Sequence, residues 1–269
     1  MPFTTHNGVR LYWRTDGLPQ GPTVVLLNSI GTGLKLWDPV VQLMGEHFQF
    51  LRLDTRGHGA SEASNNDYSL EMLASDLAAV MTAAGVEKAA LAGISLGGMI
   101  AMQFALDQPQ RVSALMLICT SPAMDPTSWA ERVALVREQG TSAIAEMAVG
   151  RFLSPAFVAS RPQVAAGLRA AIRDQANEGY AGAGAAIRDM ALIDRIADIT
   201  APTLVVTATE DVSTPFEGHG DVLLATISGA RHVAVPGGHL PQIEAPGQLA
   251  AAITEFLEPR LSARSGLLA

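Results

Sequence analysis

Residues 93–97 read Gly93-Ile94-Ser95-Leu96-Gly97, a G-x-S-x-G sequence between two apolar segments. The segment before it, 88–92, is short and apolar enough for a buried strand, and the segment after it, 98–106, repeats apolar residues at helical spacing. A strand, a tight turn and a helix in this order are typical of a nucleophile elbow, in which the serine takes strained backbone angles. Glycines two residues to either side remove the clash that side chains would make there. The pattern therefore predicts that the Ser95 hydroxyl is exposed above a sheet.

Short apolar runs alternate with helical patterns along most of the chain. Strands are expected at 23–27, 48–53, 114–118, 203–207 and 231–235, and helices from about residue 36 and at 69–84, 221–227 and 242–257. Short linkers between alternating elements predict parallel strands joined by right-handed crossover helices. The expected fold class is therefore α/β, a mostly parallel twisted sheet with helices on both faces.

The alternation stops between residues 122 and 199. This stretch is rich in alanine, has helical periodicity at 129–138, 142–149, 162–177 and 179–196, and lacks a convincing strand. A helical insertion after one strand of a parallel sheet would lie across the carboxyl ends of the strands, where ligands bind. We therefore expect a core formed by 1–121 and 200–259, a helical lid at 122–199 and a patternless tail at 260–269. A separate helical bundle is disfavoured, because the sheet pattern returns directly afterwards.

The composition narrows the classes of function. The 269-residue chain has 48% hydrophobic residues, a net charge of −8 and a single cysteine, Cys119, which is expected to fill space in the core. The negative charge argues against non-specific nucleic-acid binding and requires a local cation for any anionic substrate. One cysteine cannot form an internal disulfide, and no stretch approaches about 18 uninterrupted apolar residues, so a cytoplasmic location without a membrane span is expected. The six histidines are scattered, so neither a metal nor a cofactor is expected.

A serine hydroxyl is a poor nucleophile at neutral pH and needs a base, which in turn needs an acid to orient it. In chains with this elbow the acid and the histidine follow the serine in that order. Asp211 closely follows the strand expected at 203–207, and His239 follows the next strand in a glycine-rich loop. Both loops would open at the same sheet edge as Ser95. The sequence therefore predicts Ser95, Asp211 and His239 as a catalytic triad.

Other titratable residues fit these roles less well. Asp125 follows the strand at 114–118 and stays open as the alternative acid. His219 lies at the start of a helix, and His232 begins a strand, where it would cover the sheet. His58 belongs to the polar turn 54–61, which is expected to tie neighbouring loops.

An oxyanion formed by attack of Ser95 needs two backbone N–H donors. Leu96 is expected to supply one, because it follows the nucleophile and opens a helix whose dipole helps. The second is expected from Ile30, in the loop 28–33. That loop is rich in glycine but lacks the Gly-Lys-Ser/Thr pattern of a phosphate cradle.

Several further stretches repeat the pattern of one family. They are Asn28-Ser29-Ile30-Gly31-Thr32, Trp37-Asp38-Pro39, Asp54-Thr55-Arg56-Gly57-His58-Gly59, Trp129-Ala130-Glu131-Arg132, Asp211 with Thr214-Pro215, and His239-Leu240 with Ile243-Glu244. Together with the elbow they resemble the α/β-hydrolase superfamily over nearly the whole chain, and within it the 3-oxoadipate enol-lactone hydrolases. The chain departs from this family at Gly33-Leu34-Lys35, Phe216–Gly220 and Pro241-Gln242, all expected near the mouth of the pocket.

The resemblance implies an α/β-hydrolase fold and a serine hydrolase that opens 3-oxoadipate enol-lactone to 3-oxoadipate, in aromatic catabolism, through an acyl-enzyme. The carboxylate of this substrate needs a cation, for which Arg132, one helical turn from Trp129, is the candidate. Trp129 and Arg132 are thus the expected substrate contacts. Two alternatives stay open: a carboxylesterase or lactonase for neutral substrates, with perhydrolysis as a side reaction, and a ligand-binding protein that keeps the pocket without turnover. The oligomeric state is left open.

Overall fold

The computed structural model describes the backbone of residues 2–265 and the side chains of residues 2–259. Its strands are β1 (Phe3–His6), β2 (Val9–Gly17), β3 (Thr23–Leu27), β4 (Gln49–Leu53), β5 (Ala89–Ile94), β6 (Val112–Ile118), β7 (Thr203–Ala208) and β8 (Arg231–Val235). They form one eight-stranded sheet in the order β1-β2-β4-β3-β5-β6-β7-β8. The strands β3 to β8 pair in parallel, whereas β2 pairs antiparallel with β1 and β4.

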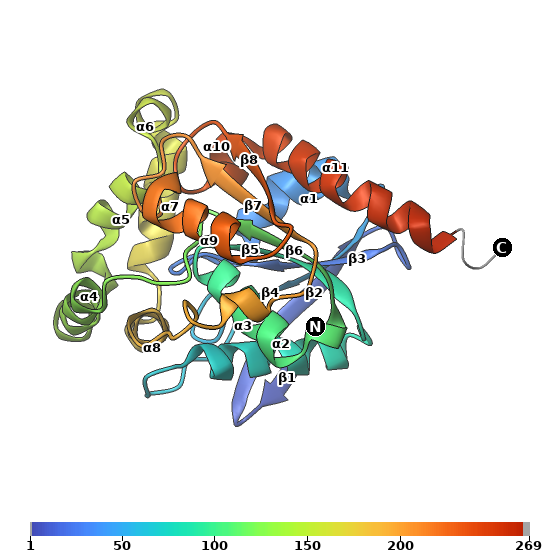
Figure 1. Ribbon diagram of the computed structural model, residues 1–269. Helices are drawn as coiled ribbons and strands as arrows, with labels where there is room; N and C mark the ends of the chain where they lie inside the picture. Colours follow the sequence, from blue (N-terminus) through green and yellow to red (C-terminus); the bar gives the residue numbers. More distant parts are fainter. Residues whose placement is uncertain (1, 266–269) are drawn as a thin grey trace.

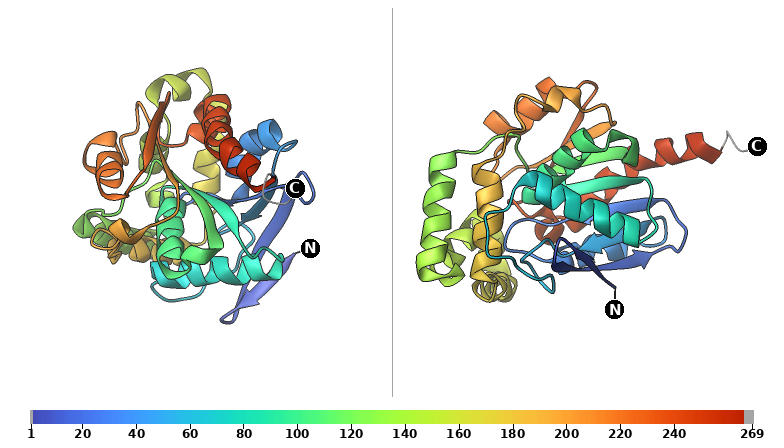
Figure 2. Two further views of the ribbon diagram at one scale, coloured as in Figure 1. Left: turned by 45° about the vertical axis from the view of Figure 1, so that its right-hand side comes forward. Right: turned by 90° about the horizontal axis from the view of Figure 1, so that it is seen from below.

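Helices cover both faces of this sheet (Figure 1, Figure 2). They are α1 (Asp38–Met44), α2 (Leu70–Ala83), α3 (Leu96–Asp107), α4 (Pro126–Gln139), α5 (Ala145–Phe152), α6 (Pro155–Ser160), α7 (Pro162–Arg173), α8 (Asn177–Arg188), α9 (Asp221–Thr226), α10 (Pro241–Glu244) and α11 (Pro246–Ser265). The helices α1 and α11 pack together on one face, and α2 and α3 pack together on the other. This arrangement confirms the predicted fold class. None of the helices in residues 2–265 combines the length and hydropathy needed to cross a bilayer.

An antiparallel hairpin at the start of the chain was absent from the predicted elements. Its strands β1 and β2 are joined by Asn7 and Gly8, which take φ angles of 47° and 77°. Positive φ at both positions fits the two-residue turn that Asn-Gly favours in hairpins. This dipeptide, followed by buried Val9 and Leu11 on alternate positions of β2, is the sequence signal for the hairpin.

The last helix is broken and longer than predicted. The prediction was one helix over 242–257, but α10 ends at Glu244 and α11 begins at Pro246 and continues to Ser265. The break lies at Ala245, with a φ of −137°, because a residue before proline is disfavoured in the α conformation. The expectation of a patternless tail at 260–269 is therefore wrong as far as Ser265, and residues 266–269 lie outside the described residues.

The stretch between β6 and β7 forms the helices α4 to α8, which lie together at one end of the sheet (Figure 1, Figure 2). The helices α4 and α8 pack closely because α8 has small residues at the contact. A Cβ added at Gly184 would lie 2.9 Å from the Val133 side chain. The short helix α6 was not predicted. The division into a core and a lid at 122–199 stays a prediction.

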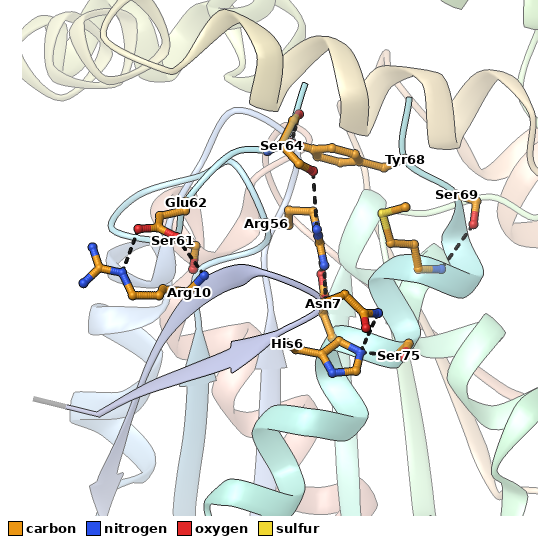
Figure 3. A network of polar contacts seen from close by, with 12 residues as sticks. His6, Asn7, Arg10, Arg56, Ser61, Glu62, Ser64, Tyr68, Ser69 and Ser75 are labelled. Atoms are coloured by element: carbon orange, nitrogen blue, oxygen red, sulfur yellow. Dashed lines mark hydrogen bonds and ion pairs between the residues drawn. The ribbon is translucent and has the colours of Figure 1, made fainter. Parts of the chain in front are cut away.

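The polar turn at 54–61 ties neighbouring parts of the core, as expected. The Arg56 guanidinium donates to the two carboxylate oxygens of Asp76 in α2 at 2.6 and 2.7 Å, and both side chains are buried. Figure 3 shows Arg56 beside Ser64 and Tyr68, and its Nη1 donates to the Ser64 hydroxyl at 3.3 Å. Burial lowers the pKa of His58 in the same turn to about 4, so this ring is neutral at pH 7. The turn is thus a structural element held by a buried ion pair.

Replacing Asp76 with alanine is expected to lower the free energy of unfolding by about 3–5 kcal/mol, because it leaves the charge of Arg56 buried without its partner. Urea unfolding followed by circular dichroism measures this loss. Asp67→Ala is the matched control, because Asp67 pairs with Arg137 and Arg188 at the surface. Its expected loss is at most about 1 kcal/mol. Equal losses in the two variants would contradict the importance of the buried pair.

Candidate active site

The turn between β5 and α3 has the geometry of a nucleophile elbow. Ser95 takes a φ of 54° and a ψ of −121°, a strained conformation for a residue with a side chain. A Cβ at Gly93 would lie 2.2 Å from the carbonyl oxygen of Gly97, and a Cβ at Gly97 would lie 2.4 Å from that of Leu27. Any side chain at these two positions would force the backbone apart. This crowding is the physical reason for the G-x-S-x-G spacing.

Asp211 and His239 meet at the carboxyl end of the sheet, after β7 and β8. The Nδ1 atom of His239 lies 2.9 and 3.0 Å from the two carboxylate oxygens of Asp211. Asp211 also accepts hydrogen bonds from the backbone N–H groups of Ser213 at 2.7 Å and Thr214 at 3.1 Å, and from the Thr214 hydroxyl at 2.9 Å. The loop after β7 therefore holds the carboxylate against the imidazole.

The surroundings of this pair keep Asp211 ionised and set the tautomer of His239. Burial alone would raise the pKa of Asp211, but the charge of a protonated His239 and its hydrogen bond, with the N–H groups of Thr214 and Ser213, lower it to about 2. An ionised carboxylate can only accept, so in the neutral imidazole Nδ1 carries the proton and Nε2 is an acceptor. Phe152 stacks on the imidazole with ring centroids 5.4 Å apart. The ring is thus held in one orientation and one tautomer.

A cavity of about 690 Å³ opens at this edge of the sheet. Ser95 and His239 line it together with Ile30 from the loop after β3 and with Trp129 and Arg132 from α4. The structure therefore brings these five predicted site residues to one space, although they come from distant parts of the chain. Ser95 and His239 form no hydrogen bond with each other among the described residues. In enzymes without substrate, such contacts are often long and tighten only in the complex.

The two backbone donors predicted for the oxyanion both lack an acceptor within the described backbone. Leu96 is the first residue of α3, and N–H groups in the first turn of a helix have no intrahelical partner. The N–H of Ile30 donates no hydrogen bond within residues 2–265. Both groups are therefore available to a ligand.

Asp125 and His232, the alternatives to Asp211 and His239, have other hydrogen-bond partners. Asp125 caps α4, and its carboxylate accepts from the N–H groups of Thr127 at 3.2 Å and Ser128 at 3.0 Å. His232 covers the sheet as expected, with Nε2 2.8 Å from the Thr207 hydroxyl. Asp211 rather than Asp125 is thus the partner of His239.

Among the other side chains that line the cavity are Met99, which was expected only in the core, Arg151 of α5, and His219, whose segment Phe216–Gly220 was expected near the mouth of the pocket. None of the three was a predicted site residue. The helix containing Arg151 was predicted to end at residue 149, and His219 follows a kink that has no periodic signal. A helix extended by one turn would have included Arg151, but only the tertiary structure shows that it lines the same cavity as Ser95.

One group of potential metal ligands occurs within the described side chains: Cys119, Asp211 and His239, with ligand atoms within 4.8 Å of one another. Cys119 is buried as predicted, but it also lies next to Asp211, which the sequence did not indicate. Burial and the charge of Asp211 raise the pKa of its thiol well above the usual value, so without a metal the thiol is protonated. Asp211 and His239 already bind each other. The arrangement fits a hydrogen-bonded pair better than a metal site, and the absence of a metal stays a prediction.

The model of the α/β hydrolase fold family matches residues 22–246. The chain belongs to the α/β hydrolase family. It is 28% identical over 243 residues to 3-oxoadipate enol-lactonase 2 of Acinetobacter baylyi, covering 90% of this chain and 91% of that protein. It is 34% identical over 231 residues to a putative carbamate hydrolase, RutD, of Klebsiella pneumoniae, covering 82% and 85%. The crystal structure of an enol-lactonase from Burkholderia xenovorans matches with a TM-score of 0.92 at 32% identity, covering 96% of this chain and all of that one (100%).

These relatives confirm the resemblance inferred from the motifs. They support hydrolase activity for this α/β hydrolase on a small molecule, and they include proteins named for more than one substrate. The choice among substrates therefore depends on the cavity.

Proposed function

We propose that this α/β hydrolase opens a small anionic enol-lactone, 3-oxoadipate enol-lactone to 3-oxoadipate, in the cytoplasmic breakdown of aromatic compounds. Residues 122–199 act as the lid in this proposal and contribute Trp129, Arg132 and Arg151 to the cavity. The observation that supports it is the pair of guanidinium groups in the same cavity as the proposed nucleophile. Neither Arg132 nor Arg151 forms an ion pair with a carboxylate in the described part of the chain.

The two guanidinium groups act on the same space. Arg132 lies over the ring of Trp129, 4.4 Å from its centroid, and Arg151 donates to the carbonyl oxygen of Val212 at 3.2 Å. Burial and the charge of Arg132 lower the pKa of Arg151, because like charges repel. The Tyr180 hydroxyl near them is buried, which raises its pKa, and the charges of Arg132 and Arg151 oppose that rise. A substrate carboxylate would relieve the repulsion and accept from these donors, whereas a neutral ester would not.

The proposed reaction proceeds through an acyl-enzyme. The Ser95 oxygen attacks the lactone carbonyl while Nε2 of His239 takes the hydroxyl proton, and Asp211 stabilises the imidazolium. The N–H groups of Ile30 and Leu96 donate to the oxyanion. The ring C–O bond then breaks, the enol oxygen takes the proton from His239, and the enol tautomerises to a ketone. Water, deprotonated by Nε2 of His239, then attacks the ester carbonyl. The bond between the acyl carbon and the Ser95 oxygen breaks, this oxygen takes the proton back from His239, and the acid is released.

The test is hydrolysis of the enol-lactone, followed by its absorbance, beside a neutral lactone, a p-nitrophenyl ester and a carbamate with the same purified protein. We expect kcat/KM for the anionic lactone to exceed that of each neutral substrate by at least about tenfold, because only the lactone contacts the guanidinium groups. A neutral substrate hydrolysed faster than the lactone would favour a broad esterase or lactonase.

Arg132→Ala is expected to raise the KM for the enol-lactone by about 10–100-fold, because it removes a charged donor to the substrate carboxylate. The KM for the neutral ester is expected to change by less than about threefold. Steady-state kinetics on both substrates measure the difference. Arg137→Ala is the matched control on the same helix, because Arg137 pairs with Asp67 outside the cavity. Equal effects of Arg132→Ala on both substrates would rule the contact out.

A further inference from the structure

The segment Phe216–Gly220, one of the places where the chain departs from the enol-lactonase pattern, puts a second histidine into the wall of the cavity. His219 lines the same cavity as Ser95 and His239. The segment is kinked, since Glu217 is extended with a ψ of 127° and Gly218 takes a φ of 81°. The left-handed conformation of Gly218 suits a glycine and breaks the helical path before His219.

Two consecutive hydrogen bonds determine which ring nitrogen of His219 carries the proton. Nδ1 of His219 lies 2.8 Å from the Ser121 hydroxyl, and that hydroxyl lies 2.6 Å from the carbonyl oxygen of Ala123. A carbonyl oxygen can only accept, so the Ser121 proton points to Ala123. The Ser121 oxygen is then the acceptor for an N–H at Nδ1. The lone pair of the neutral ring therefore lies on Nε2.

This Nε2 atom has no hydrogen-bond partner among the side chains of residues 2–259. Burial lowers the pKa of His219, although the charges of Asp211 and Asp221 oppose the shift, so the ring is neutral at pH 7. Of the other basic side chains of the wall, Arg132 and Arg151 can only donate, and Nε2 of His239 is the base of the proposed reaction at Ser95. His219 thus offers the cavity a neutral acceptor.

We propose that His219 is a specificity-determining residue, whose Nε2 accepts a hydrogen bond from a hydroxyl or N–H group of the substrate. The role rests on the proposed hydrolysis at Ser95 and is independent of which lactone is opened there. In an enol-lactone this donor arises when the ring opens, because bond cleavage leaves an enol hydroxyl. Hydroxy esters and carbamates carry such a donor before the reaction.

Pairs of neutral esters that differ by one hydroxyl test the role. The pairs are ethyl lactate with ethyl propanoate, ethyl 3-hydroxybutanoate with ethyl butanoate, and 2-hydroxyethyl butanoate with propyl butanoate. We expect the unaltered protein to prefer the hydroxylated member of at least one pair by about tenfold in kcat/KM. His219→Leu removes the acceptor and should reduce that ratio to below about twofold, whereas His219→Gln keeps an acceptor and should retain most of it.

The preference for the hydroxylated ester can also be measured as binding, without turnover. In a Ser95→Ala background, dissociation constants from NMR titration with the ester pairs should show the same preference and the same loss in His219→Leu. His232→Leu is the control, because His232 does not line the cavity. Nitrogen-15 shifts of His219 should also report a proton on Nδ1.

The two proposals can fail separately. An enol-lactone left intact, together with a hydroxyl preference that depends on His219, would refute the proposed substrate and support the role of His219. No preference in any pair by either measurement, or a preference that survives His219→Leu, would overturn the role of His219.

Discussion

Ser95→Ala is expected to lower kcat for the lactone and for esters by a factor on the order of 10⁵–10⁶. The hydroxyl oxygen of Ser95 forms the acyl-enzyme in the proposed reaction, and alanine offers no nucleophile in its place. The variant should also lose labelling by a fluorophosphonate, which reacts with activated serines. Initial rates and the mass of the labelled protein measure the two effects.

The matched control is Ser113→Ala. Ser113 lies near the amino end of β6, away from the carboxyl edge where the cavity opens. Its variant should be labelled and active like the unaltered protein. Ser95→Ala keeps the strained turn, so its free energy of unfolding should change by less than about 0.5 kcal/mol, which separates lost chemistry from lost folding. Labelling that persists in Ser95→Ala would place the nucleophile elsewhere.

Asp211→Asn is expected to reduce kcat by about 10⁴-fold. An amide has no charge to stabilise the imidazolium, and its NH₂ group can donate to Nδ1 of His239 and so favour the tautomer that cannot act as base. The carboxylate, with a pKa of about 2, is ionised at all pH values used for assays, so Asp211 should add no step to the pH profile above pH 4. Steady-state kinetics between pH 4 and 9 test both points.

The same shift in pKa has a consequence for stability. The pKa of Asp211 falls from 3.8 to about 2 on folding. A depressed pKa means that ionisation of Asp211 stabilises the fold above about pH 4, and that this stabilisation is lost as the pH falls through 2.

Asp125→Asn is the control for the loss of kcat expected in Asp211→Asn. Asparagine also caps a helix, so the variant should keep α4 intact. A greater loss of kcat in Asp125→Asn than in Asp211→Asn would reverse the choice of acid.

Local sequence was enough to predict the six parallel strands and the elbow. The runs at 23–27 and 231–235 match β3 and β8 at both ends, because the loops that bound them are rich in glycine and proline. The glycines of the elbow are required by contacts within a few residues and with the neighbouring strand. The hairpin β1–β2 also had a local signal, the Asn7-Gly8 turn, although its strands were not among the predicted elements.

The motifs predicted five of the residues that line the cavity, and the tertiary structure decided which carboxylate contacts His239 and which further side chains line the cavity. Asp125 and Asp211 both follow strands of the sheet, and Asp211 contacts His239 because β7 and β8 are neighbours in the strand order. Arg151 reaches the cavity through the packing of α5, and His219 reaches it through a kink anchored on Ser121. Such contacts join residues far apart in the chain, and a pattern that repeats every two or four residues carries no information about those distances.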